Sequence, residues 1–232
     1  MLNLLLMSSS KAANPDYLAH GRLWLQQHFA GRQVLFIPYA GVSVTAAEYS
    51  QKVSHALVSA GIEVQGIEQF NNPVHAIEKA EAVAVGGGNT FMLLHKLYET
   101  GCFDALKRRI LAGMPYAGWS AGSNIAGPSI RTTNDMPIIQ PRSFTALGLV
   151  PFQLNPHFTD ATPEGHRGET RSERIAEFMC VDNHTPVIGI AEGTALKVTG
   201  KRMSLLGDRD GVVFYNHQRQ ILKAGESCSQ WL

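Results

Sequence analysis

The stretch YAGWSAGSNIAG, residues 116–127, does most to decide how this chain is interpreted. Within it, Gly118-Trp119-Ser120-Ala121-Gly122 fits the pattern Gly-x-Ser-x-Gly. In that pattern the glycines permit a tight turn from a strand into a helix, and the turn exposes the serine hydroxyl at the edge of a sheet. The residues before Ser120 are apolar enough for a strand, and the small residues after it suit a closely packed helix. The stretch therefore predicts an α/β fold with Ser120 as a candidate nucleophile.

The rest of the chain repeats this alternation of strand and helix. Short apolar runs are separated by amphipathic stretches, which is typical of β-α-β units and a mainly parallel sheet. From about Thr194 onward, polar and apolar residues alternate around glycine-containing turns, so we expect antiparallel hairpins at one edge. We therefore predict a doubly wound, mainly parallel α/β fold with C-terminal antiparallel hairpins, as a single domain over residues 1–232. The expected strands are residues 2–7, 33–40, 62–70, 81–87, 115–120 and 185–192. The expected helices are residues 16–30, 45–60, 73–79, 90–99 and 170–180. We expect three helices to end in left-handed caps at Gly31, Gly61 and Gly101.

Composition excludes several classes of protein. Of the 232 residues 44% are hydrophobic and 17% are charged, as in ordinary globular proteins. A formal net charge of +1 gives no reason to expect nucleic acid or a membrane surface as a partner. Cys102, Cys180 and Cys228 are odd in number and widely spaced, which argues against a disulfide framework. The apolar opening run is too short for a membrane span and lacks a basic leader, so we expect a cytoplasmic protein.

A glycine-rich stretch, VGGGNTF at residues 85–91, is the second chemical signal. Consecutive glycines lose much conformational entropy on folding and are typical of places where backbone approaches a ligand closely. A phosphate-binding loop is a weak hypothesis, because the last glycine of the dinucleotide motif and any Gly-Lys-Ser/Thr are missing. The stronger hypothesis is that the amides of Gly88 and Ala121 form an oxyanion hole. A tight turn without a catalytic role is the remaining alternative.

The polar segment from Leu154 to Ile175 holds the best candidate for a general base. His157 follows Asn155-Pro156, and the proline restricts the backbone there. Imidazole titrates near neutrality, as a base for a serine nucleophile must. Asp135 could orient the imidazole in the chain order serine, acid, histidine of α/β-hydrolases, whereas Glu192 directly follows a predicted strand at the edge where such sites lie. The sequence does not show which of these two acids contacts the imidazole. Asp135 could instead form a turn, and Glu192 could instead be a cap or a surface charge.

Metal binding is a weaker hypothesis for the same segment. Glu164 and His166 could bind a metal together with His157, but their spacing matches no helical zinc motif. We therefore predict no metal ion and no cofactor.

Three long motifs together carry a family resemblance. GWSAGSNIAGPSIRTTNDMPI, VGGGNTF and NPHFTDATPEGHRGETRSERI resemble the peptidase E family, the α-aspartyl dipeptidases among the serine peptidases, and the likeness extends along nearly the whole chain. The resemblance implies a fold similar to that of the class I glutamine amidotransferases, and cytoplasmic hydrolysis of dipeptides with an N-terminal aspartate. It places Ser120 and His157 on the family's nucleophile and base, and both Asp135 and Glu192 on positions proposed for the third member. Ser123 stands where the family is expected to have alanine, a departure that matters only if its hydroxyl reaches the site.

A substrate with an N-terminal aspartate brings an ammonium and a carboxylate close to the scissile bond. Arg131 and Arg171 are candidate substrate-binding residues, because a guanidinium can grip a carboxylate with two hydrogen bonds. Glu169 or Asp160 could receive the ammonium. We expect the protein to be a monomer or a homodimer, with small peptide substrates as its only partners. The alternatives are a cyanophycinase-like or esterase hydrolase, and a non-enzymatic metabolite-binding module that needs only the glycine-rich loop and Arg131.

Overall fold

Strands and helices alternate along the chain in the computed structural model, which describes residues 1–14, 16–162, 165 and 167–232. The strands are β1 (Asn3–Met7), β2 (Val34–Ile37), β3 (Val64–Gly66), β4 (Ala82–Val85), β5 (Tyr116–Trp119), β6 (Gln153–Asn155), β7 (Val187–Gly189), β8 (Ala195–Thr199), β9 (Arg202–Leu206), β10 (Gly211–Tyr215) and β11 (Gln218–Leu222). The α-helices are α1 (Arg22–Phe29), α2 (Ala46–Val58), α3 (Pro73–Lys79), α4 (Thr90–Glu99), α5 (Cys102–Leu111), α6 (Ala121–Asn124) and α7 (Arg171–Val181).

The central sheet has the strand order β3-β2-β4-β5-β1-β8-β9 within the described residues. The five strands from β3 to β1 are parallel to one another, and β8 and β9 join them as an antiparallel hairpin. Strand β1 lies between β5 and β8, so Met7 pairs with Trp119 on one side and with Ala195 on the other. The parallel strands all end at the same edge of the sheet, which is where open α/β sheets place their sites.

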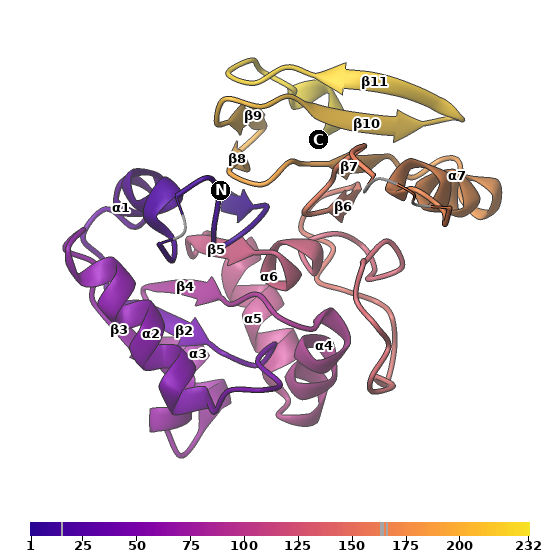
Figure 1. Cartoon of the computed structure of the whole chain (residues 1–232). Coiled ribbons are helices and arrows are strands. Elements are labelled where there is room, and N and C mark those ends of the chain that lie inside the picture. The colour runs from indigo at the N-terminus through magenta and orange to yellow at the C-terminus, as the bar shows by residue number, and fades with distance from the viewer. Residues whose placement is uncertain (15, 163–164, 166) are drawn as a thin grey trace.

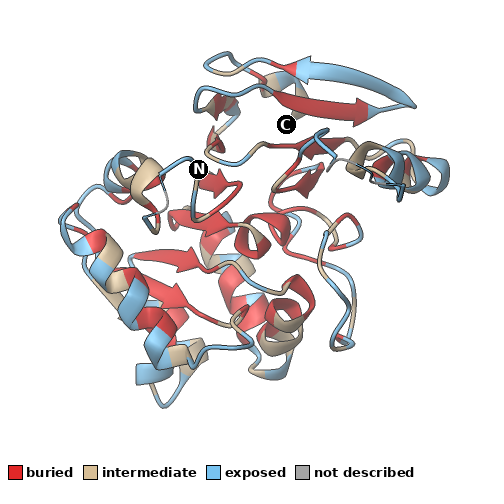
Figure 2. Ribbon diagram, viewed as in Figure 1, coloured by how far each residue is buried: buried red, intermediate tan, exposed pale blue. Residues whose placement is uncertain are grey.

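Helices cover both faces of this sheet. Alternate residues of a strand point to opposite faces, so Leu4 and Leu6 join a core cluster with α4 and α5, whereas Leu5 and Met7 join a second cluster with α1 and α2. Figure 2 shows β2, β4 and β5 as buried along their length, as expected for strands covered on both sides. This arrangement confirms the prediction of a doubly wound, mainly parallel fold.

A second, smaller sheet has the order β11-β10-β7-β6 and lies beside the central one in the orange to yellow part of Figure 1. Here β6 and β7 are parallel, and β10 and β11 add an antiparallel hairpin. Residues 185–192 were expected to form a strand of the one mainly parallel sheet. The strand that forms within this range, β7, belongs to the second sheet instead and pairs with β6 and β10. One core cluster contains Leu6 of the central sheet as well as Leu154 and Ile188 of the second sheet. A single domain over residues 1–232 would require such continuity.

Local signals account for the helix boundaries that agree with the sequence. The helices expected at residues 73–79 and 90–99 form with those bounds, and the side chains of Asn72 and Asn89 cap them by accepting hydrogen bonds from backbone amides. The helix expected from residue 16 begins only at Arg22, after Leu18 has adopted a left-handed conformation with φ 58°. The three predicted glycine caps, Gly31, Gly61 and Gly101, have φ of 80°, 68° and 71°. Within the described residues, no helix has the length and apolar composition that crossing a membrane requires.

Candidate active site

Ser120 lies in the tight turn between β5 and α6. Its φ of 53° and ψ of −114° are rare for a residue with a side chain. A Cβ atom on Gly118 would lie 2.5 Å from the carbonyl carbon of Gly122, and one on Gly122 would lie 2.2 Å from the carbonyl oxygen of Val85. Both glycines are therefore needed for α6 to pack this closely, as the Gly-x-Ser-x-Gly pattern predicts.

Ser123 packs α6 against the sheet. Its buried hydroxyl lies 2.7 Å from the carbonyl oxygen of Met7 and 2.8 Å from that of Gly118, so it links the helix to β1 and β5. Among the described residues its side chain makes no hydrogen bond to the Ser120 hydroxyl. The departure from the expected alanine thus has a structural explanation.

His157 and Glu192 come together because they follow two paired strands. Strands β6 and β7 are parallel, with Asn155 opposite Gly189, so the residues that follow them emerge at the same edge. His157 comes two positions after β6, and Glu192 comes three positions after β7. Backbone hydrogen bonds of Ile190 with Asn155 and Phe158 extend the pairing past the end of the strands. Residues 35 positions apart in sequence therefore meet.

The three side chains form a continuous hydrogen-bonded chain. His157 Nε2 lies 2.9 Å from Ser120 Oγ, and His157 Nδ1 lies 2.8 Å from Glu192 Oε1. A carboxylate can only accept, so Nδ1 carries the proton and Nε2 is free to accept the proton of the serine hydroxyl. The imidazole side chain is 35% exposed and that of Glu192 is 56% exposed, so water reaches this pair. The geometry is that of a nucleophile, a base and an orienting acid.

Ser8 ties the histidine segment to the central sheet. It directly follows β1, and its hydroxyl accepts a hydrogen bond from the His157 amide at 2.8 Å while donating one to the carbonyl of Ile190 at 2.9 Å. Ser8 is fully buried, and His157 is held with φ 56°. Sequence analysis missed this residue, although its place directly after the first strand puts it at the edge where the site forms.

Asp135 has a different position from Glu192. Its Oδ2 accepts hydrogen bonds from the amide and the hydroxyl of Thr90, at 2.7 and 2.6 Å, and from the hydroxyl of Thr133 at 3.2 Å. The carboxylate thus holds the loop after α6 on the first turn of α4, where the helix dipole favours an anion. Among the described residues all of its hydrogen bonds end on Oδ2, which leaves Oδ1 for a ligand. Of the two acids that the sequence proposed, Glu192 is the one that contacts the imidazole.

The two predicted oxyanion-hole amides belong to residues near Ser120: Ala121 follows it in the chain, and Gly88 lines a pocket together with it. Gly88 has φ 138° and a Cβ there would lie 2.2 Å from the carbonyl oxygen of Ala40, so only glycine fits. The Tyr49 hydroxyl donates a hydrogen bond to the carbonyl of Gly87 at 2.9 Å, and this fixes the peptide whose N–H belongs to Gly88. Within the described residues the amides of Gly88 and Ala121 donate no hydrogen bond, so both are available to a ligand.

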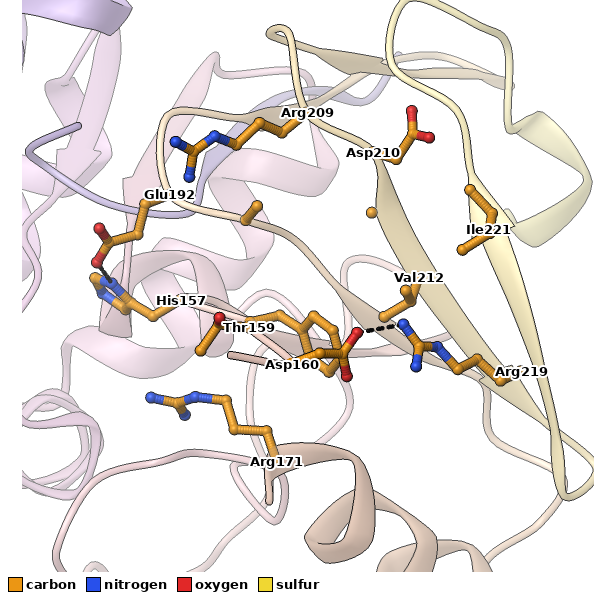
Figure 3. Close-up of a pocket in the computed structure, with 13 residues that line it drawn as sticks. His157, Thr159, Asp160, Arg171, Glu192, Arg209, Asp210, Val212, Arg219 and Ile221 are labelled. Atoms are coloured by element: carbon orange, nitrogen blue, oxygen red, sulfur yellow. Dashed lines mark hydrogen bonds and ion pairs between the residues drawn. The ribbon is translucent and has the colours of Figure 1, made fainter. Parts of the chain in front are cut away.

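A pocket of about 210 Å³ next to Ser120 and His157 contains both Asp135 and Arg171. Arg171 is the first residue of α7. Its guanidinium extends away from the helix on the side where His157 lies (Figure 3). Burial lowers the pKa of Arg171, an effect that the Glu192 carboxylate opposes, and arginine stays a cation at neutral pH. Arg131 lines an adjoining pocket, where it pairs with Asp182 at 3.4 Å.

The other acids proposed from the sequence have partners of their own. Asp160 pairs with Arg219, as Figure 3 shows, and Glu169 lies 3.4 Å from Arg174. Glu164 and His166, which the sequence analysis considered as metal ligands, lie outside the described residues. In the part of the chain that the structure describes, no three His, Cys, Asp or Glu side chains lie close enough together to hold a metal ion.

Comparison with known proteins identifies the family of this chain. The model of peptidase family S51 matches residues 4–206. The chain belongs to peptidase family S51. Two S51 relatives, both named peptidase E, come from Shewanella amazonensis and Shewanella denitrificans. They are 48% and 46% identical over all of this chain and 99% of their own length.

Two solved structures are similar to this protein in fold. A crystal structure described as a peptidase E protein, from Listeria monocytogenes EGD-e, is 27% identical with a TM-score of 0.68, over 90% of this chain and 100% of that one. A peptidase from an acI-B1 actinobacterium is 21% identical with a TM-score of 0.72, over 98% and 96%, and shares the fold. The family model and the two relatives named peptidase E confirm the resemblance to the peptidase E family and, with it, the prediction of a serine-type dipeptidase.

Proposed function

We propose that this protein hydrolyses dipeptides with an N-terminal aspartate, using Ser120 as the nucleophile, His157 as the general base and Glu192 as the acid that orients it. The observation that carries the proposal is the hydrogen-bonded chain from Ser120 Oγ through both imidazole nitrogens to Glu192, with distances of 2.9 and 2.8 Å. Family membership and the name peptidase E of the close relatives support the same substrate class.

The proposed reaction is acyl transfer to Ser120. The hydroxyl oxygen attacks the peptide carbonyl carbon while His157 Nε2 takes its proton, and the Glu192 carboxylate stabilises the imidazolium. The amides of Gly88 and Ala121 stabilise the negative oxygen of the tetrahedral intermediate. The carbon–nitrogen bond then breaks, and Nε2 gives its proton to the leaving amine. Water next attacks the carbonyl carbon of the aspartyl ester while Nε2 takes its proton, the ester bond to Ser120 Oγ breaks, and Nε2 returns the proton to that oxygen.

Opposite charges in the pocket beside Ser120 support specificity for aspartate. We assign Arg171 to the side-chain carboxylate of the substrate and Asp135 Oδ1 to its ammonium, because both residues line the pocket that also contains the nucleophile. This gives Asp135 a role in binding rather than in the triad. Arg131 is the alternative cation, but its ion pair with Asp182 and its packing 4.7 Å above the Phe178 ring already engage its guanidinium.

The proposed location is the cytoplasm. Cys102 and Cys228 are buried and Cys180 is exposed, and all three are free thiols. Unpaired cysteines are typical of proteins in a reducing compartment.

A comparison of four dipeptides tests the proposal: Asp-Leu, Asn-Leu, Glu-Leu and Ala-Leu. We expect kcat/KM for Asp-Leu to exceed that for Asn-Leu by at least about a hundredfold, because Asn leaves a partly buried cation unpaired. Arg171→Met should remove most of this preference by lowering activity on Asp-Leu, whereas the matched variant Arg131→Met should keep it. Ser120→Ala should remove nearly all turnover and keep the fold. Equal turnover of Asp-Leu, Asn-Leu and Ala-Leu would overturn the proposal.

A further inference from the structure

A second pocket, of about 630 Å³, also has Ser120 in its lining but contains neither Asp135 nor Arg171. Ser120 and His157 line both pockets, so the bond that Ser120 attacks has one half of the substrate on each side. The aspartyl half belongs with Arg171 and Asp135, and the second pocket is left for the half that departs. Its walls come from the loops after β1 and β2, the glycine-rich loop, α2 and the loop after α6. The residues used below are Tyr17, Val42, Val44, Lys52 and Ile138.

The lining of this second pocket combines exposed aliphatic side chains with uncharged polar ones such as Ser43 and Asn89, and with one lysine. Val42, Val44 and Ile138 are 56%, 38% and 52% exposed, although large apolar side chains gain free energy by leaving water. Lys52 is the one Lys, Arg, Asp or Glu among its described lining residues. The first pocket, by contrast, carries charges of both signs. The second pocket therefore suits a ligand with one anionic group and an apolar remainder.

Lys52 is held at this pocket without being neutralised. Its ammonium lies 4.3 Å from the centre of the Tyr17 ring, which also lines the pocket, and such a contact between a cation and an aromatic face is favourable. Tyr17 is in turn fixed by hydrogen bonds of its hydroxyl with Tyr49 and Trp119, at 3.1 and 3.0 Å. Within the described residues no carboxylate pairs with Lys52. The cation is therefore available to an anionic group of a ligand.

We propose that this pocket binds the leaving residue of the dipeptide, and that Lys52 pairs with its free C-terminal carboxylate while Val42, Val44 and Ile138 contact its side chain. The inference rests on the proposed function. The carboxylate is the group that every leaving residue of a dipeptide has and that the second residue of a longer peptide lacks. Lys52 thus selects substrates of two residues, and the open apolar wall accepts different side chains.

Three substrates that differ at the carboxylate test this assignment. They are Asp-Leu, its C-terminal amide Asp-Leu-NH2, and aspartyl p-nitroanilide, which has an aromatic leaving group and no carboxylate. For the unmodified protein we expect kcat/KM for the acid to exceed that for the amide about five- to tenfold, mainly through KM, as suits a charge pair that water can reach. Lys52→Met should bring this ratio to about one, and Lys52→Arg should keep it above one.

Two further variants make the result independent of folding. Lys52→Glu should invert the ratio, so that the amide becomes the better substrate, which a misfolded protein cannot do. Lys201→Met removes an exposed lysine of the β8–β9 turn and should leave the ratio unchanged. Equal rates for acid and amide in the unmodified protein, or an equal loss on all three substrates in Lys52→Met, would overturn the inference while leaving the proposed function intact. Failure to cleave all three would remove the proposed function and this inference with it.

Discussion

Replacing Glu192 with glutamine separates its role from that of Asp135. Two opposite charges about 4 Å apart attract by about 1 kcal/mol in water and about 4 kcal/mol near a protein surface. The side chains of His157 and Glu192 are 35% and 56% exposed, so an intermediate value of about 3 kcal/mol applies to the imidazolium that forms during the reaction. We expect kcat to fall about a hundredfold, which is less than the loss of about 10⁴ seen when a buried aspartate of a triad is replaced.

Steady-state kinetics with Asp-Leu measures this effect, and Asp135→Asn is the matched control because it makes the same change of charge in the same site. Glu192→Gln should leave KM within about twofold, since the proposed role of Glu192 is to hold the imidazole and not to bind the substrate. Asp135→Asn should instead raise KM and weaken discrimination between substrates. If Glu192→Gln cost less than about fivefold in kcat while Asp135→Asn abolished turnover at saturating substrate, Asp135 would be the orienting acid and the reasoning from the 2.8 Å contact would be wrong.

Two further predictions concern an unanticipated tyrosine and acid stability. Tyr49→Phe removes the hydroxyl that holds the Gly87 carbonyl, so the Gly88 amide is less fixed, and kcat should fall about five- to tenfold with KM unchanged. Tyr98→Phe, whose hydroxyl donates instead to the carbonyl of Thr145 at 3.0 Å, is the control, and an equal fall in both variants would contradict this role. Burial lowers the pKa of His28 to about 4, whereas in the unfolded chain it stays near 6.5. Protonation therefore favours unfolding: this contribution is fully present above about pH 6.5 and is lost as the pH falls toward 4, by up to about 3 kcal/mol. Urea unfolding between pH 4.5 and 7.5 should show a shallower decline for His28→Gln, and identical slopes would count against it.

Signals that act over a few residues made much of the fold predictable. The glycines at 118 and 122 are needed by the turn itself, and the caps of α3 and α4 are made by the residues just before them. The membership of β7 in a second sheet was not predictable in this way, because a short apolar strand fits many partners. Its actual partners, β6 and β10, begin more than 20 residues away on either side.

For the candidate site, too, local patterns were predictable from the sequence and contacts between distant residues were not. Ser120, His157 and the amides of Gly88 and Ala121 could be proposed from the sequence because each belongs to a local pattern with a chemical meaning. The choice between Asp135 and Glu192 depended on which carboxylate reaches the imidazole, and that follows from the pairing of β6 with β7. Ser8, Tyr49 and Lys52 escaped notice because serine, tyrosine and lysine carry no signal until their neighbours in space are known.

The position of β1 between β5 and β8 has a consequence for synthesis on the ribosome. Leu4, Leu5 and Leu6 of β1 are buried on both faces and paired on both edges in the finished protein. Its second partner, β8, begins at Ala195, about 190 residues later, and at roughly 5–20 residues per second that interval lasts roughly 10–40 s. Throughout that time the nascent chain carries an apolar strand with an open edge, which is the form most prone to associate with other chains. Newly made chains should therefore depend on chaperones until β8 has emerged, and a stall between the codons for β5 and β8 should lead to aggregation.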